Sequence, residues 1–525
     1  MTGRRLLLGL ALGALTVLGA CKKDRQPPPQ GAGVAVDTGP ADDLRRSPDG
    51  RHVAYLLNGQ KPALEGISPK VQLGALHVAP VEGGTARLVA RDVTNLPGGF
   101  AFSPDGRWIS ALAGYDLPSR SGTGVLLPLD EPTAGRIELG QAVSDITVSR
   151  DGRQVAFVDG GVLKLGPLPE GPFREIGGEV INSEFTPDGS ALFFKRRLSA
   201  GGGLMVVATS GGATPRRLSD QVGDFRIAPD GKRVAFAARS PESRDIYDLH
   251  VATFPKLEPA RVAVGVTDFR FSPDGSQLAR LEGFALGVEP ELYVGPSDGT
   301  GGRRLGKAVG TYTFSSDSAH LAYLDSYSSS ASAGVLHVVK LPDGEPKRLG
   351  VRVPNFDWAP DGSAIAFVER VFDPIYSINL SVYQVEAEGP KFAGKAVYGY
   401  GFAPDSKHVF FRTACQREGR SCRLMRYAVP TDETQTVAEG IYTYEVSEDA
   451  ERVLVTHWPV RLQTHNIGIV RADGTGHRIL DEGALLPAYL VGNGELAAYA
   501  LDGDRAGVYL APAEPGPDGT PAPGS

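Results

Sequence analysis

Apolar and polar residues alternate with strand spacing along most of this chain, and a turn signal interrupts the alternation at a nearly constant interval. The signal is Ser-Pro-Asp-Gly or a close variant, and apolar residues stand three and five positions before its Asp, as Ile227 and Phe225 do before Asp230. Two positions apart is the side-chain period of a β-strand. The signal recurs eleven times, in steps of 37 to 56 residues and most often 44, at Asp49, Asp105, Asp151, Asp188, Asp230, Asp274, Asp317, Asp361, Asp405, Asp449 and Asn493.

Each repeat has room for four short strands. A second strand follows the turn, as in Val234–Phe236, then a third strand, a Gly-rich turn and a basic-apolar fourth strand, as in Arg303–Leu305. Four strands repeated every forty-odd residues predict the blades of an all-β propeller. The turn Asp has a structural explanation, because its side chain bonds backbone two residues on. We favour that role over cation binding, since one carboxylate per blade spreads the group around a rim.

The motif Phe271-Ser272-Pro273-Asp274-Gly275, followed by an apolar strand, resembles the TolB-type, WD40-like propeller repeat, and the resemblance covers residues 33–512. It implies the fold but not a function, because propellers host many functions. The chain leaves no room for the α/β domain that precedes the propeller of TolB, so the role of TolB is not carried over. No G-x-S-x-G motif follows the repeats, which argues against the hydrolase domain that some related peptidases carry.

The ends of the repeat region indicate how the propeller closes. The last repeat offers three strands, and residues 34–36 stand where a fourth strand would precede a turn, so we expect them to complete the last blade. Two arrangements remain open for eleven repeats, one large ring or two tandem propellers. We favour two, with a boundary near residues 240–265, because most rings contain about four to eight blades.

The N-terminus indicates the compartment. Residues 1–20 have the basic and apolar regions of a signal peptide and lead into Leu18-Gly19-Ala20-Cys21, which resembles a bacterial lipobox. We expect lipidation at Cys21, a Pro-rich tether over residues 21–32, and a disordered tail over residues 513–525. The sorting rule of that lipoprotein family implies the outer membrane, with the protein facing the periplasm or the cell surface. An ordinary signal peptide with an incidental Cys is the alternative.

The other two cysteines, Cys415 and Cys422, flank a short loop between two strands. An oxidising compartment favours a disulfide across this hairpin. The formal net charge of −7 argues against nucleic acid as a partner.

No nucleophile motif or phosphate loop is present, and no cofactor is expected. Most histidines occupy equivalent places on different repeats, which keeps them apart. His457 and His465 flank one loop and would allow a two-His site, but a structural pair is favoured because no carboxylate cluster lies nearby.

Function is therefore expected on the face opposite the repeated turns, where the loops vary. On that face we expect binding residues in the loops at Tyr327, Phe372, Arg417 and Trp458. A second set stands six residues before the turn, at the mouth of the channel: Asp145, Asn182, Asp224, Asp268 and Asn355. These residues either attract a cation or basic segment or cap local backbone, and the second role is favoured.

The sequence thus predicts a lipid-anchored extracytoplasmic propeller that binds an envelope protein or glycan without catalysis. The alternative is a propeller enzyme, a polysaccharide lyase or hydrolase, with its site at the channel mouth.

Overall fold

The computed structural model describes residues 31–517 except 32, 63–67, 69, 132, 198, 200, 201, 244, 284–288, 373–375, 417–419, 462 and 463, and except the side chains of residues 376 and 458–461. Residues from Ala32 onward form one compact unit, which we call the propeller unit. Its regular structure is antiparallel β-sheet, with a short 3-10 helix, η2 (Gly503–Arg505), before the last strand. The prediction of an all-β fold is confirmed.

The strands of the propeller unit group into eleven four-stranded blades, which we number along the chain. Blade 1 contains β2 (Ala41–Arg46), β3 (His52–Gln60), β4 (Leu73–Pro80) and β5 (Arg87–Thr94). Blades 2 and 3 share one sheet of β6 (Phe100–Phe102), β7 (Trp108–Asp116), β8 (Ser121–Pro128), β9 (Ile137–Val148), β10 (Gln154–Asp159), β11 (Val162–Pro167) and β12 (Arg174–Gly178).

Five blades with a separate sheet each follow. Blade 4 contains β13 (Val180–Phe185), β14 (Ala191–Arg196), β15 (Leu204–Ala208) and β16 (Arg216–Ser219). Blade 5 contains β17 (Val222–Ile227), β18 (Arg233–Arg239), β19 (Tyr247–Thr253) and β20 (Ala260–Ala263). Blade 6 contains β21 (Val266–Phe271), β22 (Gln277–Glu282), β23 (Glu291–Pro296) and β24 (Arg303–Gly306). Blade 7 contains β25 (Tyr312–Phe314), β26 (His320–Ser328), β27 (Ala333–Lys340) and β28 (Lys347–Val353). Blade 8 contains β29 (Phe356–Trp358), β30 (Ala364–Phe372), β31 (Tyr376–Gln384) and β32 (Lys391–Gly394).

Blades 9 to 11 share a ten-stranded sheet. It contains β33 (Gly399–Phe402), β34 (His408–Gln416), β35 (Ser421–Ala428), β36 (Glu433–Val446), β37 (Arg452–Arg461), β38 (Thr464–Arg471), β39 (Arg478–Val491), β40 (Leu496–Leu501), β41 (Gly507–Pro512) and β1 (Val34–Thr38). The strands β9, β36 and β39 each pair with one blade over their first half and with the next blade over their second half. Each therefore serves as the outer strand of one blade and the inner strand of the next.

The repeated turn is held by its own polar side chains. In blade 1 the backbone N–H of His52 donates to Ser47 Oγ over 2.9 Å, and that of Arg51 donates to Asp49 Oδ1 over 3.1 Å. The same bonds recur in blade 3, where the Ser149 hydroxyl and the N–H of Arg153 hold the pKa of Asp151 below its usual range. The structural role predicted for the turn Asp is confirmed by these contacts.

Successive turns also pack on one another. Gly106 has φ +73°, and a Cβ built on it would lie 2.8 Å from Cγ of Asp49 in the preceding turn. At the equivalent position of blade 7, Ser318 has φ +62°, and its Oγ accepts the N–H of Asp274 over 3.0 Å. The turns therefore contribute to the contact between blades as well as to each hairpin.

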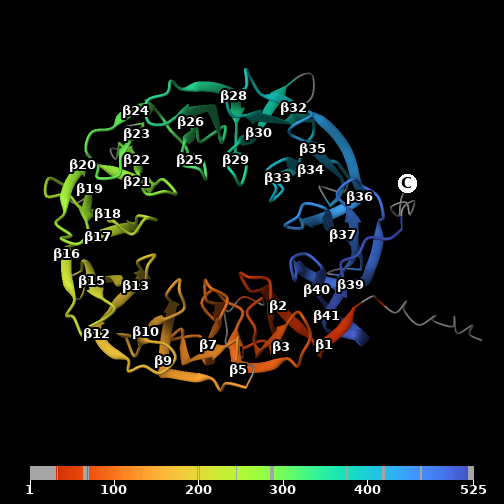
Figure 1. Ribbon diagram of the computed structural model, residues 1–525, viewed down its shortest axis with the longest axis horizontal. Helices are drawn as coiled ribbons and strands as arrows, with labels where there is room; N and C mark the ends of the chain where they lie inside the picture. The colour runs from red at the N-terminus through yellow and green to blue at the C-terminus, as the bar shows by residue number, and fades with distance from the viewer. Residues whose placement is uncertain are drawn as a thin grey trace, which may run out of the picture. The chain divides into compact units, whose positions relative to one another are not determined.

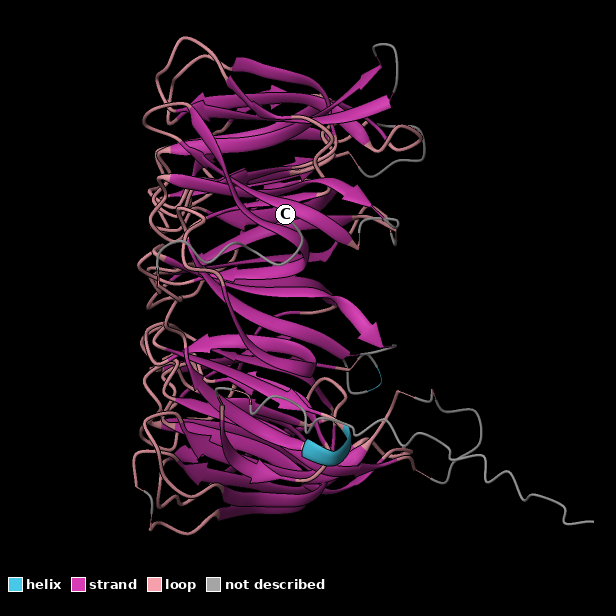
Figure 2. Ribbon diagram, turned by 90° about the vertical axis from the view of Figure 1, so that its right-hand side faces the viewer, coloured by secondary structure: helices cyan, strands magenta, loops and turns pink. Residues whose placement is uncertain are grey.

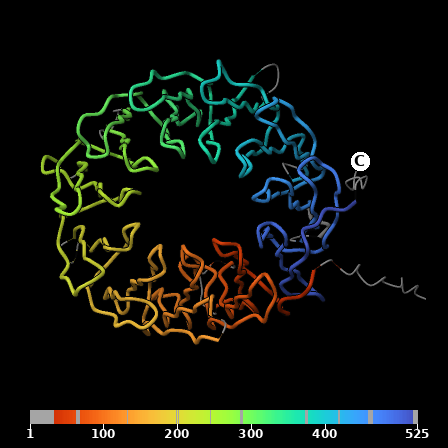
Figure 3. Tube along the Cα trace, in the orientation of Figure 1, coloured from red at the N-terminus to blue at the C-terminus, as the bar shows by residue number. Residues whose placement is uncertain are grey.

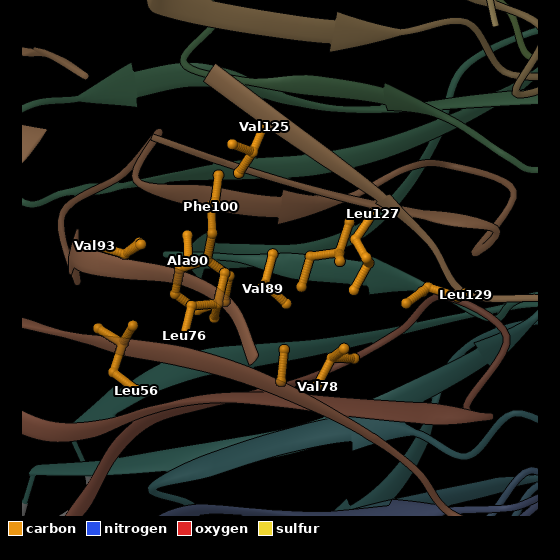
Figure 4. Close-up of a cluster of buried hydrophobic side chains, with 13 residues drawn as sticks. Leu56, Leu76, Val78, Val89, Ala90, Val93, Phe100, Val125, Leu127 and Leu129 are labelled. Atoms are coloured by element: carbon orange, nitrogen blue, oxygen red, sulfur yellow. The ribbon is translucent and has the colours of Figure 1, made fainter. Parts of the chain in front are cut away.

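The hydrophobic core lies between blades. Within the described residues the buried apolar side chains form eleven clusters, and each cluster joins two neighbouring blades. Figure 4 shows the cluster between blades 1 and 2, where Leu56, Leu76 and Val78 meet Phe100, Val125 and Leu127. Another cluster joins blade 11 to blade 1, where Val491 and Ala498 meet Leu44 and Val53. The contacts form a closed cycle, and Figure 1 shows the eleven blades as one ring.

The ring is therefore single. Residues 240–265, where we expected a boundary between two propellers, lie within blade 5 and the connection to blade 6. One core cluster joins these two blades through Leu249, Val251, Phe269 and Leu278. Base rates for blade number favoured two rings, but every interface between blades has a core of the same kind, so nothing interrupts the packing.

The N-terminal strand closes the ring. β1 pairs with β41, with Val34 opposite Leu510 and Thr38 opposite Gly507, and Figure 3 shows the red start of the propeller unit beside its dark-blue last blade. The predicted closing strand is confirmed. Residues 513–517, which we expected to begin a disordered tail, are held in place, because Ala513 is fully buried and the N–H of Gly516 donates to Gly476 O over 2.7 Å. The rest of the expected tail lies outside the described residues.

The propeller unit has two faces, seen from the side in Figure 2. The first strand of each blade ends at the Ser-Pro-Asp-Gly turn, so these turns share one face, which we call the turn face. The connection into each first strand and the loop between second and third strands share the other, which we call the loop face. The first strands lie closest to the ring axis, and the fourth strands lie outermost (Figure 1).

Candidate functional site

Several inner strands expose polar side chains on the surface that faces the ring axis. Positions six and four before the turn residue point to one side of each strand. In blade 5 these are Asp224 and Arg226, whose side chains are about half exposed, at 54% and 50%. Solvent therefore reaches the inner wall of the ring at this level.

The structure places the five predicted channel-mouth residues at one level of five inner strands. Asp145, Asn182, Asp224 and Asp268 lie in β9, β13, β17 and β21, and Asn355 directly precedes β29. In blades 4 to 6 each follows a β-bulge, where the pairing with the second strand shifts by one residue. The backbone N–H of Phe225 donates to Asp224 Oδ1 over 2.9 Å, which is the local capping bond considered for this position.

Some of these carboxylates are paired with arginine. Arg226 lies 3.0 Å from Asp224, and Arg270 lies 3.2 Å from Asp268, in each case two residues along the same strand. Arg45 pairs with Asp43 in the same way in blade 1. The sequence carries this signal as a recurring Asp-x-Arg, which our sequence analysis missed. The inner strands of blades 1, 5 and 6 thus carry both acidic and basic side chains.

Other inner-strand carboxylates have raised pKa values. Burial raises the pKa of Asp145, although its side chain remains exposed toward the axis. Burial also raises the pKa of Glu184. The nearby charge of Arg226 lowers this pKa, and that of Asp224 raises it. Burial raises the pKa of Asp357 as well. Loss of hydration is the first cause in all three, rather than repulsion between like charges.

Arg46 and Glu445 form a clasp on the inner wall where the ring closes. Arg46 of blade 1 pairs with Glu445 of blade 10. Between them lies Leu490 of blade 11, whose carbonyl oxygen accepts from Arg46 over 2.8 Å and whose N–H donates to Glu445 over 2.9 Å. Two neighbouring blades thereby satisfy the inner backbone edge of the closing blade.

A cleft of about 300 Å³ opens between the inner strands of blades 7 and 8. Thr313, Phe314, Phe356 and Trp358 line it, and the Trp358 indole N–H donates to Thr313 O over 3.1 Å. Asp357 is the titratable residue of its lining. This indole bond ties the two inner strands together across the cleft.

The loop face carries most of the exposed apolar surface. Nine large hydrophobic side chains are exposed in the described part of the chain, and six of them lie at the loop face: Ile181, Val264, Val351, Phe372, Tyr398 and Leu486. The other three, Val34, Leu88 and Phe392, lie in outer strands. The loop face therefore carries six of these nine exposed apolar groups.

The four predicted loop residues have different outcomes. Phe372 is 65% exposed at the end of β30. Tyr327 is half-buried and packs over Gly310, where a Cβ would meet its ring. Arg417 and the side chain of Trp458 lie outside the described residues, as does Cys21. The predicted disulfide between Cys415 and Cys422 is confirmed, with a Cα–Cα distance of 4.0 Å.

The histidine pair differs from the expected one. His457 Nε2 lies 3.2 Å from His477 Nε2, whereas His465 Nδ1 lies 3.1 Å from the backbone oxygen of His457. Burial, with a smaller effect of His477, lowers the pKa of His457 to about 4. Gly468 makes room for this contact, since a Cβ there would lie 3.2 Å from His477 Nε2. The described residues contain no group of three or more metal-ligating side chains.

The likenesses of this chain to known proteins lie among solved structures. No family model and no curated protein matches the chain. Among solved structures, one titled "Crystal structure of the eukaryotic initiation factor" aligns at a TM-score of 0.44 and 12% identity, over 78% of this chain and 90% of that one. Another, titled "Crystal structure of the tricorn protease", aligns at a TM-score of 0.25 and 13% identity, over 84% of this chain and 58% of that one. At these scores neither likeness indicates a function for this chain. No helix in the described part is long and apolar enough to cross a bilayer.

Proposed function

We propose that this protein is an extracytoplasmic binding scaffold of the TolB-type, WD40-like repeat class, anchored by a lipid at Cys21, that engages an envelope protein or glycan through its loop face. The observation that carries the proposal is the placement of exposed apolar side chains. Six of the nine lie at the loop face of the described structure, including Phe372 and Tyr398, and the other three lie in outer strands near the ends that approach the turn face. Exposed aromatic groups on a rigid scaffold are typical of binding surfaces.

The closing strand supports the same choice of face. Val34 pairs with Leu510, toward the turn-face end of blade 11, and Thr38 pairs with Gly507, toward the loop face. A tether that leads to Val34 therefore joins the propeller unit at the turn-face end of its outermost strand. In the proposed anchored protein, the loop face is the one directed away from the attachment point.

Photo-crosslinking from the two faces tests the binding role. A photoreactive amino acid is placed at Ile181 or Tyr398 on the loop face and, as matched controls, at the exposed turn-face residues Lys232 or Glu451. We expect adducts with an envelope component in whole cells from the loop-face positions and not from the turn-face positions. Adducts of equal yield from both faces, or from neither, would refute the proposal.

Labelling with a fatty-acid analogue tests the anchor separately. We expect the wild-type protein to be labelled and to fractionate with membranes, and Cys21→Ser to be unlabelled and released. Equal labelling of the two proteins contradicts lipidation at Cys21, whatever the outcome of the crosslinking.

A further inference from the structure

Three of the six loop-face apolar side chains surround the tip of one blade. Val351, Phe372 and Tyr398 are 41%, 65% and 56% exposed. Val351 lies near the loop-face end of β28, the fourth strand of blade 7. Phe372 lies at the end of the second strand of blade 8, and Tyr398 lies in the connection that leaves blade 8. Three exposed apolar side chains thus lie at the loop-face ends of blades 7 and 8 and in the connection to blade 9.

Contacts between these segments make the group continuous with blade 9. The backbone N–H of Val351 donates to Glu369 Oε1 over 2.9 Å. The Arg352 guanidinium lies 5.8 Å from the centre of the Phe372 ring. The N–H of Tyr398 donates to Arg412 O over 2.9 Å. We call the group of Val351, Arg352, Phe372, Lys395, Tyr398 and Arg412 the blade 8–9 surface.

The charge of this surface is opposite to that of the whole chain. Its charged members, Arg352, Lys395 and Arg412, are basic, whereas the chain carries a formal net charge of −7. Glu369 beneath it accepts the Val351 N–H and is half-buried. Exposed aromatic side chains rimmed by arginine are typical of the energetic centres of protein interfaces.

We propose that the blade 8–9 surface docks an acidic protein segment that also carries apolar side chains. Carboxylates of such a segment complement the exposed Arg352 and Lys395, while its apolar side chains cover Phe372 and Tyr398. A protein segment fits better than a glycan because Val351 and Phe372 offer apolar area without hydrogen-bonding groups. This inference rests on the proposed loop-face binding role and specifies the site and the partner.

The test uses the purified full propeller unit with a defined probe. The probe is a fluorescent synthetic peptide in which glutamate alternates with leucine and phenylalanine, and binding is measured by anisotropy. We expect Arg352→Glu with Lys395→Glu to weaken binding at least about tenfold, and Tyr398→Ser about fivefold. The matched control, Arg51→Glu with Lys232→Glu, reverses two exposed charges on the turn face and should leave binding unchanged. All four side chains are exposed, and unchanged thermal melting verifies that each variant is folded.

Each other outcome overturns the inference. Absence of peptide binding, or binding that the control pair weakens as much as the blade 8–9 pair, removes the site. Binding of vesicles containing phosphatidylglycerol, or of polygalacturonate, that competes with the peptide and responds to the same variants assigns the surface to another class of ligand. If crosslinks form from the loop face but only from blades other than 8 and 9, the proposed function stands and this assignment fails.

Discussion

Contact between successive turns makes Gly106 a sensitive position. Substitution by alanine has two costs there. The first is the left-handed backbone, since φ is +73°, which destabilises a residue with a Cβ by about 1 kcal/mol. The second is steric, since the new Cβ would lie 2.8, 2.9 and 3.1 Å from Cγ, Oδ2 and Oδ1 of Asp49. Asp49 cannot retreat freely, because its carboxylate accepts from Ser47 and from the N–H of Arg51.

The chain offers a control in which only the first cost is present. Gly211 has φ +75°, and a Cβ built on it would meet nothing within 4 Å. We expect Gly211→Ala to lower the free energy of unfolding by about 1 kcal/mol, and Gly106→Ala to lower it by about 2 to 4 kcal/mol because overpacking is added. Gly106→Ser should be milder than Gly106→Ala, since Ser318 and Ser406 occupy this position elsewhere and accept the N–H of the preceding turn Asp.

Equilibrium urea unfolding, followed by intrinsic fluorescence and circular dichroism, measures these differences. The comparison is valid where the three variants share one slope against urea concentration. If Gly106→Ala and Gly211→Ala lose the same stability, the turns do not support one another, and the role assigned to their packing is wrong.

Three further predictions concern the closing strand, the histidine pair and the disulfide. Deleting residues 34–37 removes most of the pairing with β41, so we expect a lower melting temperature and self-association by light scattering, whereas an unchanged melting temperature and monomer content would contradict closure by β1. The pKa of His457 is lowered to about 4 in the folded protein, so the neutral ring stabilises the fold above its unfolded pKa near 6.5. The wild-type free energy of unfolding therefore falls by about 2 kcal/mol between pH 7 and pH 5 because of this histidine. Urea unfolding of His457→Gln at the two pH values should show a decrease smaller by that amount, and equal decreases in the two proteins would contradict the assignment. Reducing Cys415–Cys422 should cost about 2 to 3 kcal/mol in the chain-entropy model, and equal stability of the wild type and Cys415→Ser, Cys422→Ser would exclude this contribution.

Local features of the fold could be predicted from the sequence because they depend on near neighbours. The turn bonds of Ser47 and Asp49 join residues two to five positions apart, so each repeat specifies its own hairpin. The closing strand could also be predicted, since residues 34–36 stand at a regular offset from Asp49. The number of rings could not be predicted from the sequence. It depends on the wedge angle that the buried side chains set between neighbouring blades, and no spacing along the chain encodes that angle.

The sequence predicted on which strands some polar residues lie, but not the side chains with which they pair. Asp224 and Asp268 lie on inner strands as expected, but the arginine two residues later was overlooked, although Asp-x-Arg is visible in the sequence. His477 could not be paired with His457 from the sequence, because the contact depends on the space left by Gly468 in the strand between them. Phe372 was expected on the loop face and is exposed there, and its binding role stays a prediction. The exposure of Val351 and Tyr398 was not predicted, because Val351 lies in the outer strand β28 and Tyr398 in the short connection before β33 rather than in the longer loops.

The position of β1 bears on the order of events during synthesis. The first strand of the propeller unit, β1, waits for its partner β41, which is the last strand of that unit to be made. Until β41 emerges, blade 11 lacks its third strand, and β1 has no strand with which to pair. A product truncated before Gly507 would retain most blades, each with its own hairpins, yet it would leave unpaired sheet edges that invite aggregation or proteolysis. Ring closure thus makes folding a check on whether the whole propeller unit has been made.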